Sequence, residues 1–432
     1  MKKWIKLGVL SLLTLTITSC SIFGSGYNSL TKSPSKIEDK KKYFKDKLNN
    51  EWNNKEFLSG FKNYSFNLSK ELLESSNDEN IVFSPLSLHY AMSNLYNGGS
   101  EKSKSEILKL LNQDGEKLNE NNLNLLAFSL NTFNNEGIFD TNNSVWINEA
   151  DKNLVNKNFL NRSKEYYLSD VFFEDLSKKS TAKMMEKWVS EKTRNMIKPE
   201  IKPEKDTLVT LFNTLYFESK WKNEFNKNDN KNLPFKLSNA TEVEKTFMSK
   251  NKKIGEYYKG SNFQMANMQF KNSIKIEFVL PDENVKIEDL IKDENKLKEI
   301  LNKEYNDKAK INWLIPKFEV ESKFDLIPTI KNLGLKSIFN KNENNFPYIK
   351  ESDKNIFVSL IDQITSMKID EQGGKATSKT QINLKEKSAP TSDESKIVDM
   401  KLDRPFMYIL YFELDNGEKN VEMPVVIGII NK

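Results

Sequence analysis

From about residue 57 onward, the chain mixes helical and strand-like spacing of apolar residues, without an internal repeat. One helix is predicted to follow Ser84-Pro85, because serine is a favoured N-cap and proline suits the first helical position. Apolar residues then recur at i, i+4 and i+7: Leu88, Met92 and Leu95. Gly98-Gly99 is expected to end this helix. Ser103-x-x-Glu106 resembles a capping box, so a second helix is predicted to open at Ser103.

Other stretches have the alternation or the continuous apolar character of strands. They span residues 143–148, 207–217, 273–280, 406–414 and 421–430. The last two are separated by Asp415-Asn-Gly417, a hairpin turn signal. Strands interleaved with helices over one long segment predict a mixed α+β domain with large sheets.

The first twenty residues resemble an export signal. Three early lysines precede an apolar run over residues 7–17, which is too short for a lasting transmembrane span. Residues 17–20 also resemble a bacterial lipobox, which implies cleavage before Cys20 and lipidation of its sulfur. The alternative is an ordinary signal peptide with an incidental cysteine.

This pattern divides the chain into a signal peptide at 1–19, a lipidated cysteine with a flexible tether at 20–56, and a globular part at 57–432. The expected location is the bacterial cell surface, with the lipid holding the protein at the outer face of a membrane.

Composition removes several classes of function. The chain has 432 residues, and length alone would favour two or three domains. A net charge of +5 from 66 basic and 61 acidic residues gives no reason to expect nucleic acid. The single cysteine excludes an intramolecular disulfide, and the single histidine, His89, lies in the first predicted helix, where a structural role is expected. Neither a metal nor an organic cofactor is expected.

The sequence contains no complete phosphate-binding loop and neither of two common hydrolase motifs. Gly373 to Thr377 faintly resembles a phosphate-binding loop, but the full pattern needs glycine at 369 and serine or threonine at 376, where the chain has Ile369 and Ala376. Neither a Gly-x-Ser-x-Gly elbow nor a His-Glu-x-x-His motif is present, so an enzyme is not expected.

Several segments, in this order, are similar to the serpin family. They span residues 80–87, 188–193, 206–217 with Trp221, 278–281, 316–318, 325–334 and 403–406. The resemblance covers nearly all of 57–432. It implies one α+β domain with a large mixed central sheet, smaller sheets, about eight or nine helices, and an exposed reactive loop at about 371–397.

The resemblance also implies a polar cluster under the main sheet, called the shutter, that helps the sheet to open. The matching residues are Ser84, Ser87 and Asn213, and Gln363 stands where the family usually has a histidine. Glutamine donates and accepts as neutral histidine does, so the network is expected to work without a pH switch. Trp221 matches the tryptophan at the top of the sheet, the breach where insertion begins.

Residues 369–380 resemble the hinge of the reactive loop, with Glu371 and Gly373 at its start. After cleavage the loop would enter the sheet as a strand, whose alternate residues face one side. One alternate set is small and uncharged: Gly374, Ala376, Ser378 and Thr380. The other set holds Lys375, Thr377 and Lys379 and suits solvent. A glycine-rich linker would explain small residues but not the shared register of the two lysines.

Counting Glu371 as one, the family's spacing places the scissile bond after the seventeenth residue, between Lys387 and Ser388. Lysine before the bond suits a trypsin-like pocket. The alternative is that Lys387 is one lysine among several, because Lys385 and Lys396 lie nearby and the segment from Ser388 is longer than usual. Gly374 also departs from the threonine or serine usual at the first inserted position, which weakens strand propensity.

The leading hypothesis is a monomeric suicide inhibitor that traps trypsin-like serine proteases as a covalent acyl complex. Three alternatives stay open: a serpin fold without inhibition, a serpin directed at cysteine proteases, and an unrelated surface lipoprotein such as a solute-binding protein or hydrolase.

Overall fold

The computed structural model describes residues 55–74, 79–113, 123, 126, 137–149, 155–167, 169–202, 209–272, 274–303, 305, 307–349, 355–374, 396–415 and 420–432. The first helix begins at Lys55, slightly before the expected start of the globular part at 57. The turn at Asn416-Gly417 lies outside the described residues, but Asp415 pairs with Asn420 across the hairpin that was predicted there.

Eight α-helices and two short 3₁₀ helices lie within the described residues. They are α2 (Lys55–Glu74), α3 (Pro85–Tyr96), α4 (Glu101–Leu110), α6 (Lys157–Glu165), α7 (Lys179–Lys192), α8 (Ile287–Lys292), α9 (Glu294–Asn302), α10 (Ile327–Asn332), η2 (Lys227–Asp229) and η3 (Ser337–Phe339). The predicted start of α3 is confirmed: Ser84 is the N-cap, its side chain accepts from the Ser87 backbone N–H, and Pro85 is the first helical residue. Nearly all of α3 is buried, which is wider than the one apolar face in the sequence pattern.

The predicted start of α4 is wrong. The helix begins at Glu101, and its N-cap is Ser100, whose side chain accepts from the Ser103 backbone N–H. Ser100 directly follows the glycine pair that ends the preceding helical turn, so it can cap the helix earlier, and Glu101 then lies in the first turn where a negative charge is favoured. The Glu106 side chain therefore has no part in capping its own helix and can bind another segment.

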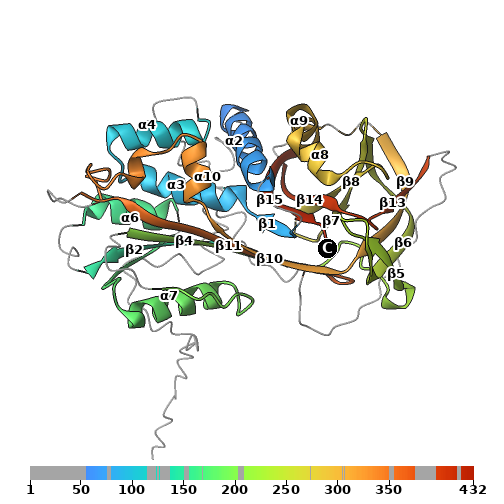
Figure 1. Ribbon diagram of the computed structural model, residues 1–432, viewed down its shortest axis with the longest axis horizontal. Helices are drawn as coiled ribbons and strands as arrows, with labels where there is room; N and C mark the ends of the chain where they lie inside the picture. Colours follow the sequence, from blue (N-terminus) through green and yellow to red (C-terminus); the bar gives the residue numbers. More distant parts are fainter. Residues whose placement is uncertain are drawn as a thin grey trace, which may run out of the picture.

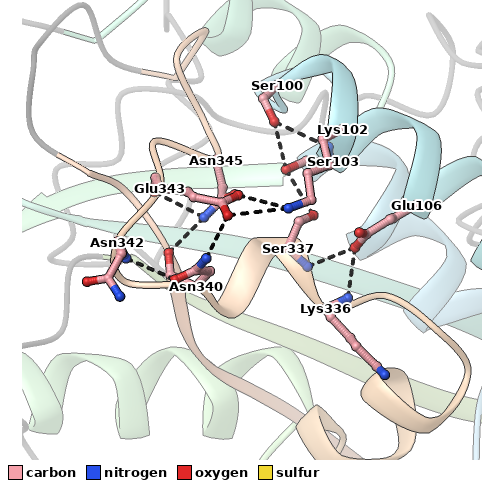
Figure 2. A network of polar contacts seen from close by, with 10 residues as sticks. All are labelled: Ser100, Lys102, Ser103, Glu106, Lys336, Ser337, Asn340, Asn342, Glu343 and Asn345. Carbon is pink, nitrogen blue, oxygen red and sulfur yellow. Dashed lines mark hydrogen bonds and ion pairs between the residues drawn. The ribbon is translucent and has the colours of Figure 1, made fainter.

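The side chains of α4 fasten the segment that leads into the main sheet (Figure 2). The Glu106 carboxylate accepts from the backbone N–H groups of Lys336 and Ser337, both at 2.8 Å. Lys102 forms an ion pair with Glu343, with 3.1 Å between Nζ and Oε2. These contacts hold the chain just before the sheet against the helical layer.

Six strands form the main sheet. In spatial order they are β10 (Phe318–Asp325), β11 (Val358–Asp370), β4 (Val209–Ser219), β2 (Gly137–Asn148) and β3 (Ser169–Glu174), with the short β12 (Gly373–Gly374) pairing with β11. β11 and β4 are parallel, whereas β10 with β11 and β2 with β4 are antiparallel. The sheet is thus mixed, as predicted.

The main sheet is covered on both faces (Figure 1). Helices α3, α4, α6 and α10 lie on one side, and α7 lies alone on the other. Trp188 and Met185 of α7 pack on apolar side chains of the sheet such as Phe212 and Ile364. Both faces are covered, so β4 is buried over nearly its whole length, and its run of apolar and β-favouring residues predicted a central strand.

The smaller sheets run together as one sheet of nine strands. Its order is β1 (Ile81–Phe83), β15 (Asn420–Ile430), β14 (Phe406–Asp415), β8 (Ile274–Pro281), β7 (Phe263–Gln269), β6 (Glu242–Lys259), β9 (Asp307–Pro316) and β13 (Ile397–Lys401), with β5 (Lys231–Lys236) pairing with β6. It occupies the right-hand side of Figure 1. The strands predicted at 273–280, 406–414 and 421–430 correspond to β8, β14 and β15, and β2 begins at Gly137 rather than at 143.

Candidate functional site: a polar row and a hinge at the main sheet

Gln363 joins the main sheet to the start of α3. Its Oε1 accepts from the Ser84 backbone N–H and its Nε2 donates to the Ser84 carbonyl oxygen, each at 2.9 Å. The Ser84 hydroxyl donates to the Val425 carbonyl oxygen at 2.7 Å and accepts from the Ser87 backbone N–H at 3.1 Å. The amide of Gln363 therefore meets one donor and one acceptor of the same residue.

Asn213 lies directly beside Gln363 on the neighbouring strand. Its Nδ2 donates to the Ser87 carbonyl oxygen at 3.0 Å and to Oδ1 of Asn143 on β2 at 2.5 Å. Asn143, Asn213 and Gln363 form a row across three adjacent strands, all buried under α3. Sequence reasoning missed Asn143, because only the pairing register of β2 and β4 brings it into the row.

One atom in this row and one atom of α3 beside it lack hydrogen-bond partners among the described residues. Within the described residues, Asn213 Oδ1 and Ser87 Oγ are buried and have no hydrogen-bond partner. An unsatisfied buried polar group costs roughly 1–3 kcal/mol. The sheet is therefore held together here by a network that has acceptors and donors to spare.

The pairing between β4 and β11 stops before the strands end. Their parallel register runs over seven pairs, from Val209 with Val358 to Leu215 with Thr365. Beyond this point β11 pairs with β12 instead, at Ile369 with Gly374 and Asp370 with Gly373. The two strands therefore separate at one end, and the hinge lies at the opening.

The hinge has already entered this opening. Gly373 pairs with Asp370 of β11 and forms an antiparallel bridge with Lys220 at the end of β4. Its φ is +137°, and a Cβ there would lie 2.1 Å from the Ser219 carbonyl oxygen, so no other residue fits. A Cβ on Gly374 would lie 2.6 Å from Cε1 of Phe217. The departure from the family's usual threonine or serine at 374 thus has a steric reason.

Trp221 and its neighbours hold the chain just before the hinge. The Trp221 backbone N–H donates to the Gln372 carbonyl oxygen at 2.8 Å, and its indole N–H donates to the Asp370 carbonyl oxygen at 2.9 Å. The indole is fully buried and stacks on Phe270, with ring centroids 4.3 Å apart. The Phe225 backbone N–H donates to the Glu371 carbonyl oxygen at 2.9 Å.

Glu371 is buried and paired. Its Oε1 accepts from Asn230 Nδ2 at 2.5 Å and lies 3.1 Å from Lys317 Nζ. Burial by itself would raise the pKa of Glu371, but the Asn230 hydrogen bond and the Lys317 ammonium outweigh it, so the pKa is lowered. Asn230 and Lys317 were not predicted as site residues. Lys317 lies within the 316–318 motif, but nothing local in the sequence points to its partner.

The remaining hinge and bait residues, Ala376, Ser378, Thr380, Lys387 and Ser388, lie outside the described residues, as does Cys20. Their roles stay predictions from the sequence.

His89 lies outside the site. It is fully buried among the rings of Phe57, Phe61 and Tyr64, with the nearest centroids 5.3 Å away. Its Nδ1 lies 3.3 Å from the Ser93 hydroxyl, and burial lowers its pKa to about 3. These surroundings fit the structural role expected for it.

Among the described residues, no group of three or more His, Cys, Asp or Glu side chains could hold a metal ion. A search of the same residues finds no helix that is both long and apolar enough to span a membrane.

The fold and the site define a class of protein. In the mixed main sheet, the parallel strands β4 and β11 pair over only part of their length. The glycine hinge lies between them where they separate. The sequence of residues 59–417 matches the family model described as "Serpin (serine protease inhibitor)". The chain belongs to the serpin family.

Relatives and solved structures agree. The chain is 26% identical to human neuroserpin over 326 residues, which cover 72% of this chain and 78% of neuroserpin. It is 27% identical over 356 residues to an uncharacterized serpin-like protein of Methanosarcina acetivorans, with 81% of each chain covered. The crystal structure of the thermophilic serpin tengpin in the native state matches with a TM-score of 0.75 at 24% identity, covering 88% of this chain and 95% of tengpin.

Proposed function

We propose that this protein is a suicide inhibitor of trypsin-like serine proteases, which cleave its loop between Lys387 and Ser388 and are trapped as the loop enters the main sheet. The observation that carries the proposal is the hinge between β11 and β4. Gly373 pairs with both strands above a ladder that has already separated at that end.

The register of the hinge supports insertion of the residues that follow. Gly374 stands opposite Ile369 on β11, and Gly373 stands opposite Lys220 on β4. Continued as an antiparallel strand, both registers place Thr380 between Gln363 and Asn213, which are neighbours in the sheet. The Thr380 hydroxyl would then reach the row in which Asn213 Oδ1 has no partner among the described residues.

The same register sorts the loop by face. Directly opposed residues share a face, so Gly374, Ala376, Ser378 and Thr380 would point with Asn213 and Gln363 into the buried layer. Their small size suits that layer, and none of them carries a charge.

The opposite face sets a condition that the sequence did not reveal. Lys379 would stand between Thr214 and Ile364, both of which are buried, and Ile364 packs in the apolar cluster that includes α7. A lysine is favourable there only if solvent reaches it. Insertion therefore requires α7 to move away from the sheet.

The insertion exchanges one parallel ladder of seven pairs for two antiparallel ladders. Parallel pairing is slightly weaker per residue, so both the number and the kind of hydrogen bonds favour the inserted state.

A mixture of the protein with trypsin on a denaturing gel tests the proposal. We expect a band near the summed mass that survives detergent and boiling, and a released peptide that begins at Ser388. Lys387→Glu should abolish this band, because a trypsin-like pocket carries an acidic residue that repels glutamate. Cleavage without the band would mean that the loop is only a substrate, as in a serpin without inhibitory function. A band with a cysteine protease but none with trypsin would change the target class.

We also propose that the lipid on Cys20 anchors the protein at the outer face of a bacterial membrane. The support is the sequence of residues 1–20 alone. Cys20→Ser should move the protein from the membrane fraction to the medium; an unchanged distribution would contradict the anchor.

A further inference from the structure

A cavity lies where β6 and β7 separate. The two strands pair only from Tyr257 with Ala266 to Lys259 with Gln264. Beyond this pairing, the register of β6 with β9 shifts between Lys250 and Lys253. A cavity of about 370 Å³ opens at this fork. Small-molecule sites typically have roughly 300–1,000 Å³, so the space suffices for a small organic ligand.

The lining of the cavity is strongly basic. Four of its residues are lysines: Lys222, Lys250, Lys253 and Lys308. Lys222 donates to the neutral Gln269 side chain at 2.9 Å. In the described part of the chain, neither Lys222, Lys253 nor Lys308 has a carboxylate within ion-pair distance. A lysine ammonium group only donates hydrogen bonds, so these side chains favour a ligand that carries acceptor atoms.

The one carboxylate that lines the cavity, Glu256, stands opposite Lys308 in the β6–β9 register, but its ion pair among the described residues is with Lys275, which is not in the lining. Its Oε2 accepts from Asn267 Nδ2 at 2.6 Å and lies 3.7 Å from Nζ of the buried Lys275. Its charge is therefore shared with a cation outside the cavity. The positive charge of the lining remains in excess.

Lys250 is partly buried and feels the positive charge of Lys253. Its ammonium donates to the Asn223 and Glu224 carbonyl oxygens at 2.5 and 2.7 Å. The pKa of Lys250 is nevertheless lowered to about 8, first by burial and then by the positive charge of Lys253, against the opposing effect of Glu224. Burial disfavours charge of either sign, so only the effect of Lys253 reflects a positive potential, and that potential favours an anion.

Apolar side chains complete the lining. Trp313 is 3% exposed and Met268 is half-buried, and both border the same space as the lysines. Ile254, also in the lining, is 58% exposed, so its side chain offers apolar surface to a ligand. A ligand body of carbon atoms would cover this exposed surface.

We propose that this fork binds a small organic anion, with one acidic head group held by the lysine ammonium groups and an apolar body lying against Trp313, Met268 and Ile254. Glu371, Gly373 and Gly374 are not among the lining residues, so the inference does not rest on the proposed inhibition of proteases.

Isothermal titration of the full protein with 1-naphthyl phosphate and 2-naphthoate tests this site, with inorganic phosphate and neutral 2-naphthamide as comparison probes. We expect both naphthyl anions to bind and the amide not to bind. Inorganic phosphate should bind at least tenfold more weakly than naphthyl phosphate. The double variant Lys253→Gln/Lys308→Gln should weaken both naphthyl anions at least tenfold, because it removes two exposed cations from the lining.

Lys179→Gln/Lys183→Gln on α7 is the matched control, since it changes the net charge equally at exposed positions far from the fork in the sequence. The control should bind as the parent does. Equal loss in both double variants, or no binding by the parent, would overturn the proposal. If inorganic phosphate binds as tightly as naphthyl phosphate, the proposed contact of an apolar ligand body with Trp313, Met268 and Ile254 is wrong. If the parent binds neither naphthyl anion but the fork variant traps trypsin more slowly, the surface serves the protease and the ligand site is wrong.

Discussion

Gln363 stands in a row of side chains that carries no titratable group. Its amide satisfies the N–H and the carbonyl of Ser84 at once, and its neighbours Asn213 and Asn143 are amides as well. A histidine at 363 would have to stay neutral to do the same. Opening of the sheet at this row should therefore not change with pH between about 5 and 8, where histidine titrates.

His89 gives the folded protein a pH dependence of another kind. Its folded-state pKa is about 3, below the ordinary value of 6.5, because burial disfavours the charged ring. As pH falls below 6.5 the unfolded chain binds a proton first, so stability is full above 6.5 and decreases toward 3. The slope should be about 1.4 kcal/mol per pH unit.

Urea unfolding at pH 7.5, 6.5 and 5.5 measures this slope, compared with a His89→Leu variant that has no histidine. The difference in unfolding free energy between the two proteins should decrease on acidification. Parallel curves would show that His89 does not stay neutral in the fold.

Lys317 holds the buried carboxylate of Glu371 at the foot of the hinge. Lys317→Met leaves that carboxylate with Asn230 as its remaining side-chain partner, and we expect a loss of about 1–2 kcal/mol, since the lysine is partly exposed. Lys368→Met removes the exposed partner of Glu319 and should cost less than about 1 kcal/mol. Denaturant melts compare the two variants. Equal losses of unfolding free energy would show that the Lys317–Glu371 pair stabilises the fold no more than an exposed ion pair does.

At the scale of elements, the hinge fits its opening only because two glycines lie against the end of β4. The ring of Phe217 occupies the space that a side chain at 374 would need. β12 is therefore specified by sterics on the neighbouring strand and not by its own propensity.

Gly374→Val should turn an inhibitor into a substrate, because the added side chain collides with Phe217 as insertion begins. Trypsin should still cleave the loop, while the covalent band is lost. Phe217→Leu in the same chain makes room and should restore part of the band. If Gly374→Val traps trypsin as well as the parent does, insertion does not begin at this contact.

The elements that could be predicted are those with local signals. Ser84-Pro85 and the spacing after it placed α3, and two apolar runs around Asn416-Gly417 placed β14 and β15. The start of α4 was wrong because two serines compete for the cap and the glycine pair favours the earlier one. The long strand β6 was not predicted, since lysine-rich stretches interrupt its apolar alternation.

The candidate site was predictable only in part. Ser84, Ser87, Asn213, Gln363 and Trp221 were named through a family resemblance, and the structure brings the first four together and places Trp221 at the hinge. The partners of these residues come from elements that are distant in sequence: Asn143, Asn230 and Lys317. Their contacts depend on strand register and packing, which no local pattern encodes.

At the scale of the whole molecule, the inserted state should be the more stable one. Cleavage would let the main sheet gain a strand with two ladders. We expect the melting temperature of the cleaved protein to exceed that of the intact protein by more than about 10 °C. Calorimetry before and after limited cleavage checks this. The Gly374→Val protein, cleaved in the same way, should show no such rise.

The rate at which the seven-pair ladder between β4 and β11 opens would then decide whether a protease is trapped. Once the protease has cut the loop, separation of these strands races against water attacking the bond that joins protease and inhibitor. If water releases the protease before the loop has inserted, the inhibitor molecule has been cleaved without trapping it. The number of inhibitor molecules consumed per trapped protease would therefore measure how fast the ladder opens, and a looser ladder would trap more efficiently while leaving the intact protein more prone to open on its own.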